Sequence, residues 1–174
     1  VLTYAGVRQY HSVAEHDKNV QAKAKGYKLR GKGGQGDVYT TNLLVKLVCL
    51  LANKVATLDP SGIGIEMEAN KPDWYDALNG LPGLLGSSIS ETFEVKRFAV
   101  FVQKAVANLR LDDSATVMIF EELADFIQSL TQVLSIEDDP LKYWHKSNDL
   151  KEHYRHAIRY GIKGQEKFLT VADI

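Results

Sequence analysis

The sequence predicts an all-α fold, with residues 1–174 forming a single helical domain that one long ordered loop interrupts. Three observations lead to this prediction. Apolar residues recur at helical spacing through much of the chain, and residues suited to capping stand where the expected helices begin. Residues 62–92 show no such period and exceed the length of an ordinary connection. With 45% hydrophobic and 25% charged residues, the chain has the composition of a globular domain.

The first strong helix prediction covers residues 42–58, which are apolar on nearly every face. The β-branched positions leave a strand as the competing interpretation, but the length of the run favours a helix. Thr41 or Asn42 would cap its start, and Pro60 would follow its end. A helix that is apolar all round is expected to be buried on most sides. A shorter, Ala- and Lys-rich helix is expected within residues 12–25.

Two further helices are expected in the middle of the chain. Ser88 and Glu91 have the spacing of a capping box, which predicts a helix over about 89–110. Residues 115–135 are expected to form an amphipathic helix, because apolar side chains recur there at intervals of three and four. The residues in this pattern are Val117, Phe120, Leu123, Ile127, Leu130 and Leu134.

A last helix is expected from Pro140 to about Tyr160. Asp139 would be its N-cap, Pro140 its first helical residue, and Gly161 a residue just past its end. The run KFLTV at 167–171 is expected to be a short strand. Most of the chain is therefore expected to be helical.

The glycine-rich run GKGGQG at 31–36 lies in a basic part of the chain. It differs from the phosphate-binding pattern G-x-x-x-x-G-K-[ST] and lacks the apolar strand that precedes a dinucleotide-binding turn. A glycine-rich turn is the favoured interpretation. The basic residues around it are interpreted as a solvated surface, and no nucleic-acid partner is expected.

Residues 62–92 contain the strongest chemical candidates, because Asp73-Trp74-Tyr75-Asp76 places carboxyl groups beside aromatic rings. An apolar wall raises the pKa of a carboxyl group by desolvating its charged form. A carboxyl group that stays protonated near neutral pH can donate its proton to a glycosidic oxygen. The alternative is structural: the acids cap turns while Trp74 and Leu78 fill a core. The pattern alone leaves both interpretations open.

The segment Asp73-Trp74-Tyr75-Asp76-Ala77-Leu78-Asn79 resembles the D-W-N-D-G-x-N segment of cellobiose-phosphorylase-like enzymes. These belong to the clan of inverting glycosidases and phosphorylases that are built on an (α/α)₆ toroid. The wider run KPDWYDALNGLPGLLGSS is similar to sequences of that group. The chain departs from the motif at Tyr75, where Asn is usual, and at Ala77, where Gly is usual.

The resemblance implies that Asp76 is the general acid of an enzyme that cleaves or phosphorolyses a glycosidic bond with inversion. Trp74, Tyr75 and Asn79 would then form the substrate-binding part of the loop. An inverting hydrolase needs a second carboxylate to activate water, whereas a phosphorylase uses inorganic phosphate as co-substrate.

Three nearby residues are the remaining candidates for this site. Glu66 and Glu68 are the candidates for the base or for binding sugar hydroxyls, and their spacing would place both on one side of an extended segment. Lys71 would serve the phosphate. The implied substrate is an oligosaccharide or disaccharide.

The resemblance also implies an (α/α) toroid-type domain. A toroid of twelve helices would exceed the length of this chain, so we expect residues 1–174 to be a fragment of a larger glycosidase or phosphorylase catalytic domain. The expected partners beyond the sugar are the rest of the parent chain or a second copy.

No cofactor other than phosphate and no metal is expected, because H-E-x-x-H is absent and Cys49 is the single cysteine. With no long apolar run and no signal-peptide pattern, we expect a cytoplasmic protein without a membrane partner. The competing hypothesis is a non-catalytic helical module whose aromatic loop binds a glycan or a partner protein.

Overall fold

The computed structural model describes residues 2–4, 7–9, 28–66 and 87–174, and helices form the larger part of what it describes. The α-helices in these ranges are α2 (Leu43–Val55), α4 (Ile89–Asn108), α5 (Glu121–Ile136) and α6 (Pro140–Ala157). Short 3₁₀ helices occur at Lys32–Gly34 and Val171–Asp173. The helix expected within residues 12–25 lies outside the described residues.

The prediction of an all-α fold is wrong, because the described residues also form antiparallel strand pairs and the fold is mixed α/β. Strands β1 (Leu2–Tyr4) and β2 (Val7–Gln9) pair with each other. Strand β3 (Ile65–Glu66) pairs with β4 (Ser87–Ser88), and β5 (Thr116–Phe120) pairs with β6 (Glu166–Thr170). This finding also overturns the toroid-type architecture expected from the resemblance.

The main error concerns residues 116–120, which were expected to begin a helix and instead form strand β5. Val117 and Ile119 are buried, whereas Met118 between them is 46% exposed, so the side chains alternate as a strand requires. Met118 lies opposite Phe168 of β6, and five residue pairs hold the two strands in register. β6 confirms the expected C-terminal strand.

The helix starts follow the predicted caps. The Asn42 side chain accepts a hydrogen bond from the backbone N–H of Val45 at 3.0 Å. Ser88 Oγ accepts one from the N–H of Glu91 at 3.3 Å, and Asp139 Oδ1 accepts from the first turn of α6. Local side-chain chemistry therefore sets these helix starts. α6 ends at Ala157, about three residues before the expected end.

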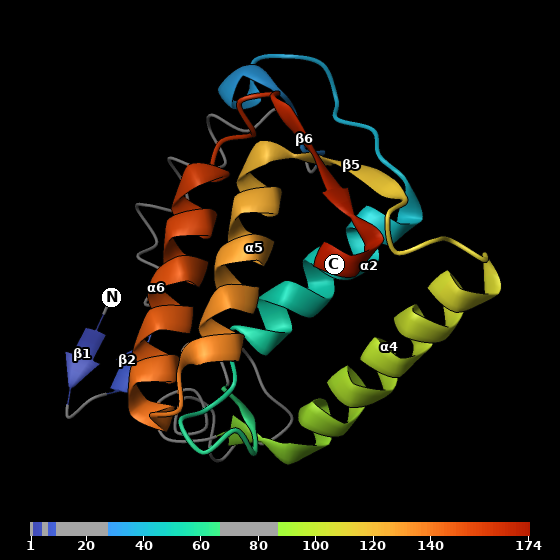
Figure 1. The fold of residues 1–174 in the computed structure, drawn as a ribbon. Coiled ribbons are helices and arrows are strands. Elements are labelled where there is room, and N and C mark those ends of the chain that lie inside the picture. The colour runs from blue at the N-terminus through green and yellow to red at the C-terminus, as the bar shows by residue number, and fades with distance from the viewer. Residues whose placement is uncertain (1, 5–6, 10–27, 67–86) are drawn as a thin grey trace.

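Helices α2, α5 and α6 pack around one core, and the β5–β6 ribbon covers one end of it (Figure 1). α5 contributes most to this core, with Leu123, Ala124, Phe126, Ile127 and Leu130 all buried. α2 is less buried than expected, since Leu43 is 69% and Leu50 is 52% exposed.

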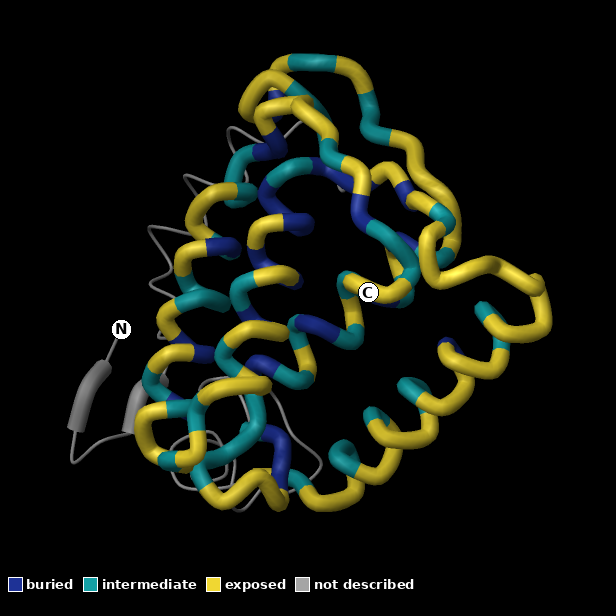
Figure 2. Tube along the Cα trace, viewed as in Figure 1, coloured by how far each residue is buried: buried dark blue, intermediate teal, exposed yellow. Residues whose placement is uncertain are grey.

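Helix α4 packs mainly on α2, and most of its surface is exposed (Figure 2). Val102 is the one buried residue of this helix, whereas Phe93 and Phe101 are exposed. Helix α4 therefore buries little of its apolar surface. None of the described helices is long and apolar enough to cross a membrane.

Candidate functional site

The structure describes one of the seven predicted site residues, Glu66. The other six lie outside the described residues: Glu68, Lys71, Trp74, Tyr75, Asp76 and Asn79. The described part of the candidate site consists of Glu66 and of the elements that hold the two ends of segment 67–86.

The two ends of segment 67–86 are joined by the β3–β4 pair. Ile65 lies opposite Ser88, and Glu66 lies opposite Ser87. Ser88 is also the N-cap of α4, so the segment returns directly into a helix start. The residues that flank the acidic and aromatic motif are thus held next to each other by backbone pairing.

Asp59 stabilises the β3–β4 pair, which is the base of segment 67–86, through a set of hydrogen bonds. Its carboxylate accepts from the N–H groups of Ile63 and Gly64, each at 3.0 Å, and from Ser87 Oγ at 2.7 Å. Burial acts to raise the pKa of Asp59, but the hydrogen bonds from Ser87, Ile63 and Gly64 outweigh it and lower that pKa. Asp59 therefore stays ionised and ties the turn before β3 to strand β4.

Glu66 points back to α6, where the indole N–H of the buried Trp144 donates to Glu66 Oε1 at 2.6 Å. Desolvation by burial raises the pKa of Glu66 above its ordinary value. The hydrogen bond from Trp144 and the charge of Lys151 act in the opposite direction but do not outweigh burial. The result is a half-buried carboxyl group that holds its proton more strongly than an exposed glutamate.

This arrangement can take part in acid–base chemistry. A carboxyl group with a raised pKa can exchange a proton with a substrate closer to neutral pH than an ordinary glutamate. Sequence reasoning named Glu66 but missed Trp144, which fixes its orientation. The two residues are 78 positions apart in the chain, and no local pattern connects them.

The glycine-rich turn at 31–36 is not arranged to bind phosphate. Each of its six backbone N–H groups donates to a carbonyl oxygen, including Lys32 to Lys163 at 3.2 Å and Gly33 to Ile162 at 3.0 Å. A phosphate-binding loop needs N–H groups that are free to bind the ligand. The turn instead joins the segment before α2 to the connection between α6 and β6.

The histidines of α6 do not form a metal site with their described neighbours. His145, His153 and His156 lie on this helix. Among the residues that the structure describes, no group of three or more His, Cys, Asp or Glu side chains is placed to hold a metal ion.

No family model matches the chain, and no curated protein or solved structure matches it either.

Proposed function

We propose that the protein is a carbohydrate-active enzyme, or a part of one, that cleaves or phosphorolyses a glycosidic bond with inversion. The proposal rests on the resemblance of residues 73–79 to the cellobiose-phosphorylase-like motif, and it does not depend on a toroid fold. The structural observation that supports it is the base of segment 67–86. There the β3–β4 pair joins the two ends of the segment beside Glu66, a half-buried carboxyl group with a raised pKa.

In this proposal Asp76 protonates the leaving glycosidic oxygen, and Trp74 and Tyr75 bind the sugar. Glu66 or Glu68 activates water if the enzyme is a hydrolase. If it is a phosphorylase, inorganic phosphate attacks instead, and Lys71 binds it. Trp144 has a positioning role, because its indole N–H orients the Glu66 carboxyl group.

The test is turnover of a panel of disaccharides, with and without inorganic phosphate, with the first-formed anomer followed by NMR. Asp76→Asn removes the proposed acid, so we expect turnover to fall by at least about a hundredfold while the circular dichroism spectrum stays the same. Asp73→Asn is the matched control and should lose much less. Turnover that requires phosphate identifies a phosphorylase. Turnover that Asp76→Asn leaves unchanged contradicts the assignment.

The second candidate is a non-catalytic helical module that binds a glycan or a partner protein through its aromatic loop, and helix α4 offers further aromatic side chains for such binding. Phe93 is 63% and Phe101 is 58% exposed on this helix, so both rings are accessible to a partner. A chain that binds a disaccharide in a titration but turns over none of the panel would support this candidate instead.

A further inference from the structure

An open cleft of about 450 Å³ lies between the glycine-rich turn, the segment that leads from it into α2, and the β5–β6 ribbon (Figure 1). The lining residues are Gly31, Lys32, Gly36, Asp37, Val38, Tyr39, Thr40, Met118, Ile162, Lys163, Gly164 and Glu166. None of them belongs to segment 62–92, so the cleft is separate from the proposed glycosidic site.

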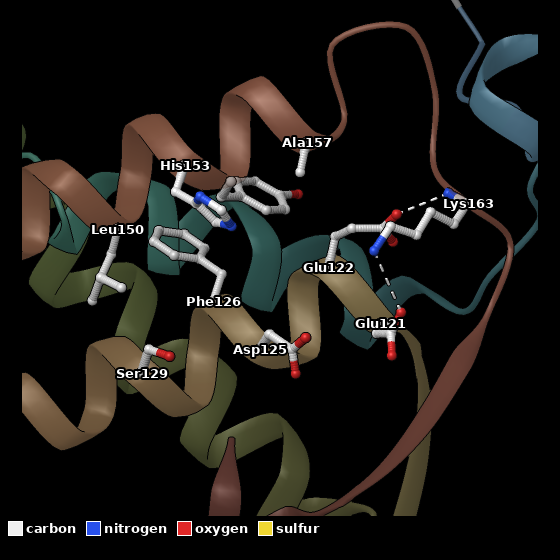
Figure 3. Close-up of a pocket in the computed structure, with 10 residues that line it drawn as sticks. Glu121, Glu122, Asp125, Phe126, Ser129, Leu150, His153, Ala157 and Lys163 are labelled. Atoms are coloured by element: carbon white, nitrogen blue, oxygen red, sulfur yellow. Dashed lines mark hydrogen bonds and ion pairs between the residues drawn. The ribbon is translucent and has the colours of Figure 1, made fainter.

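One wall of the cleft is fixed by the connection between α6 and β6. The N–H of Lys32 donates to the carbonyl oxygen of Lys163 at 3.2 Å. The N–H of Gly33 donates to the carbonyl oxygen of Ile162 at 3.0 Å. Lys163 is held in turn by Glu122 of α5, whose Oε1 accepts a hydrogen bond from its backbone N–H at 2.8 Å (Figure 3). The shape of this wall therefore does not depend on a ligand.

Tyr39 links the segment before α2 to the ribbon and holds the two sides of the cleft at a distance. Its hydroxyl donates to Glu166 Oε1 at 2.9 Å, and its ring packs edge-on against Phe120 with the centroids 5.5 Å apart. Burial raises the pKa of Tyr39, whereas a hydrogen bond from the backbone of Phe120 acts to lower it. The Tyr39 hydroxyl therefore lies at the edge of β5.

The segment before α2 has unpaired main-chain groups at Val38. Val38 forms an antiparallel bridge with Arg30, and its hydrogen bonds come from the residues on either side of Val38. The carbonyl oxygen of Asp37 accepts at 3.1 Å, and the N–H of Tyr39 donates at 2.8 Å. In this geometry the N–H and C=O of Val38 point away from Arg30. None of the described hydrogen bonds uses them.

Strand β5 has a matching edge at Met118. The hydrogen bonds that flank the β5–β6 register, at Ala115 and Glu121, fall on odd-numbered residues. Hydrogen-bonded pairs alternate along an antiparallel ladder, so the N–H and C=O of Met118 point away from β6. The same holds for Phe120, whose backbone reaches Tyr39. Two residues that line the cleft, Val38 and Met118, therefore have main-chain groups free for a third strand.

The side chains around the cleft do not favour an ion of either sign. Two lysines, Lys32 and Lys163, are balanced by two carboxylates in the lining, those of Asp37 and Glu166. Met118 is 46% exposed and adds apolar surface. The cleft thus combines main-chain donors and acceptors with an apolar side chain, which are the features that bind an added β-strand.

We propose that this cleft binds a short extended peptide, which lies as a strand between Val38 and Met118. The peptide backbone hydrogen-bonds to both edges, and one of its apolar side chains packs on Met118. At the ~30 Å³ that a water molecule occupies in the liquid, the cleft has room for about fifteen heavy atoms. That size suits about three residues with small side chains. The two-stranded ribbon gains a third strand, which strengthens it.

The experiment titrates the whole chain with N-acetyl-Thr-Val-Thr N-methylamide, an uncharged peptide whose residues favour an extended backbone. Binding is followed by the backbone amide NMR signals of Val38 and Met118, and we expect saturable shifts of both. The same peptide methylated at the valine nitrogen lacks one N–H and should bind about fivefold or more weakly. If either signal fails to show a saturable shift, or if the two peptides bind equally, the proposal is wrong.

Two proline variants at one cross-strand pair locate the binding edge, because proline lacks the N–H and is tolerated at strand edges. Met118→Pro removes an N–H on the cleft side of β5, so we expect about fivefold or more weaker binding, followed at Val38. Phe168→Pro is the matched control. Phe168 lies opposite Met118, and its N–H points to the far edge of β6, so affinity should stay within about twofold.

Unchanged affinity in Met118→Pro, or equal losses in the two proline variants, contradicts the assignment. The comparison of the two peptides tests it in the unaltered chain, without any variant.

Discussion

Glu66 and Glu122 are two carboxyl groups removed from solvent to different degrees, and the structure gives them different partners. Glu66 receives a hydrogen bond from the Trp144 indole N–H and is also influenced by the charge of Lys151. Glu122 receives one backbone hydrogen bond and keeps one oxygen without a donor. A raised pKa points to proton exchange at Glu66, whereas the second oxygen of Glu122 is enclosed by the described residues without a hydrogen-bond donor.

The raised pKa of Glu66 makes stability depend on pH in a predictable direction. Because the folded state holds this proton more strongly than the unfolded state, its contribution to the free energy of unfolding falls as pH rises from the ordinary glutamate value through the raised value. Glu66→Gln removes this dependence. Urea unfolding from about pH 4 to pH 8 should therefore show the stability of the unaltered chain falling with pH relative to the variant.

Glu94→Gln is the matched control for that experiment, because Glu94 is an exposed glutamate on α4 that pairs with Arg97. The free energy of unfolding of the unaltered chain, relative to Glu94→Gln, should not show the fall with pH that is expected relative to Glu66→Gln. If the unaltered chain and Glu66→Gln differ in free energy of unfolding by the same amount over this pH range, then burial does not raise the pKa of Glu66.

At the scale of elements, the predictable features are those set by neighbouring residues. Asn42, Ser88 and Asp139 cap their own helices, so three helix starts could be read from the sequence. Strand β5 could not be predicted in this way, because its partner β6 lies about fifty residues later in the chain. The spacing from Val117 through Phe120 to Leu123 also happens to fit a helix across the junction between β5 and α5.

The candidate site was predictable to a smaller extent, for a similar reason. A local motif made residues 73–79 the candidates, which lie outside the described residues, and the loop length drew attention to Glu66. The contacts that give Glu66 its properties come from Trp144 and Lys151 of a distant helix, and burial dominates its pKa. The same holds for Glu122, whose backbone donor Lys163 follows it by 41 residues. Such sites depend on tertiary packing, which local patterns do not encode.

The turn at 31–36 is an element whose glycines can be tested one against another. Gly34 has φ +91°, and a Cβ added there would overlap the carbonyl oxygen of Tyr160. Gly33 has φ +59° and has nothing within 4 Å of an added Cβ. Gly33→Ala should therefore cost about 1 kcal/mol of unfolding free energy for its backbone conformation alone.

Gly34→Ala should cost about 1–3 kcal/mol more, because it also pushes this turn away from the connection between α6 and β6. Chemical denaturation of both variants measures the difference. Equal losses would show that the contact between the two loops contributes little to stability.

At the scale of the whole molecule, Tyr154 links the elements that surround the core. Its ring stacks on Phe126 of α5 and lies 6.5 Å from Phe120 at the end of β5. Its hydroxyl contacts Cys49 of α2, and burial raises the pKa of the phenol, so Tyr154 stays uncharged. One side chain of α6 thus touches the other two central helices and the β5–β6 ribbon.

These contacts predict that Tyr154 substitutions change the stability of the core as a unit. Tyr154→Ala should lower the free energy of unfolding by about 3–5 kcal/mol, because it removes a buried ring and leaves a cavity. Tyr154→Phe keeps the ring and loses only the contact with Cys49, so it should cost less than about 1.5 kcal/mol. His156→Ala, on the exposed side of the same helix, should change the free energy of unfolding by no more than about 0.5 kcal/mol.

Urea unfolding followed by circular dichroism and by fluorescence should give coincident transitions for every variant. If Tyr154→Ala separates the two transitions, then α6 unfolds independently of α2 and α5, and the core is not one cooperative unit.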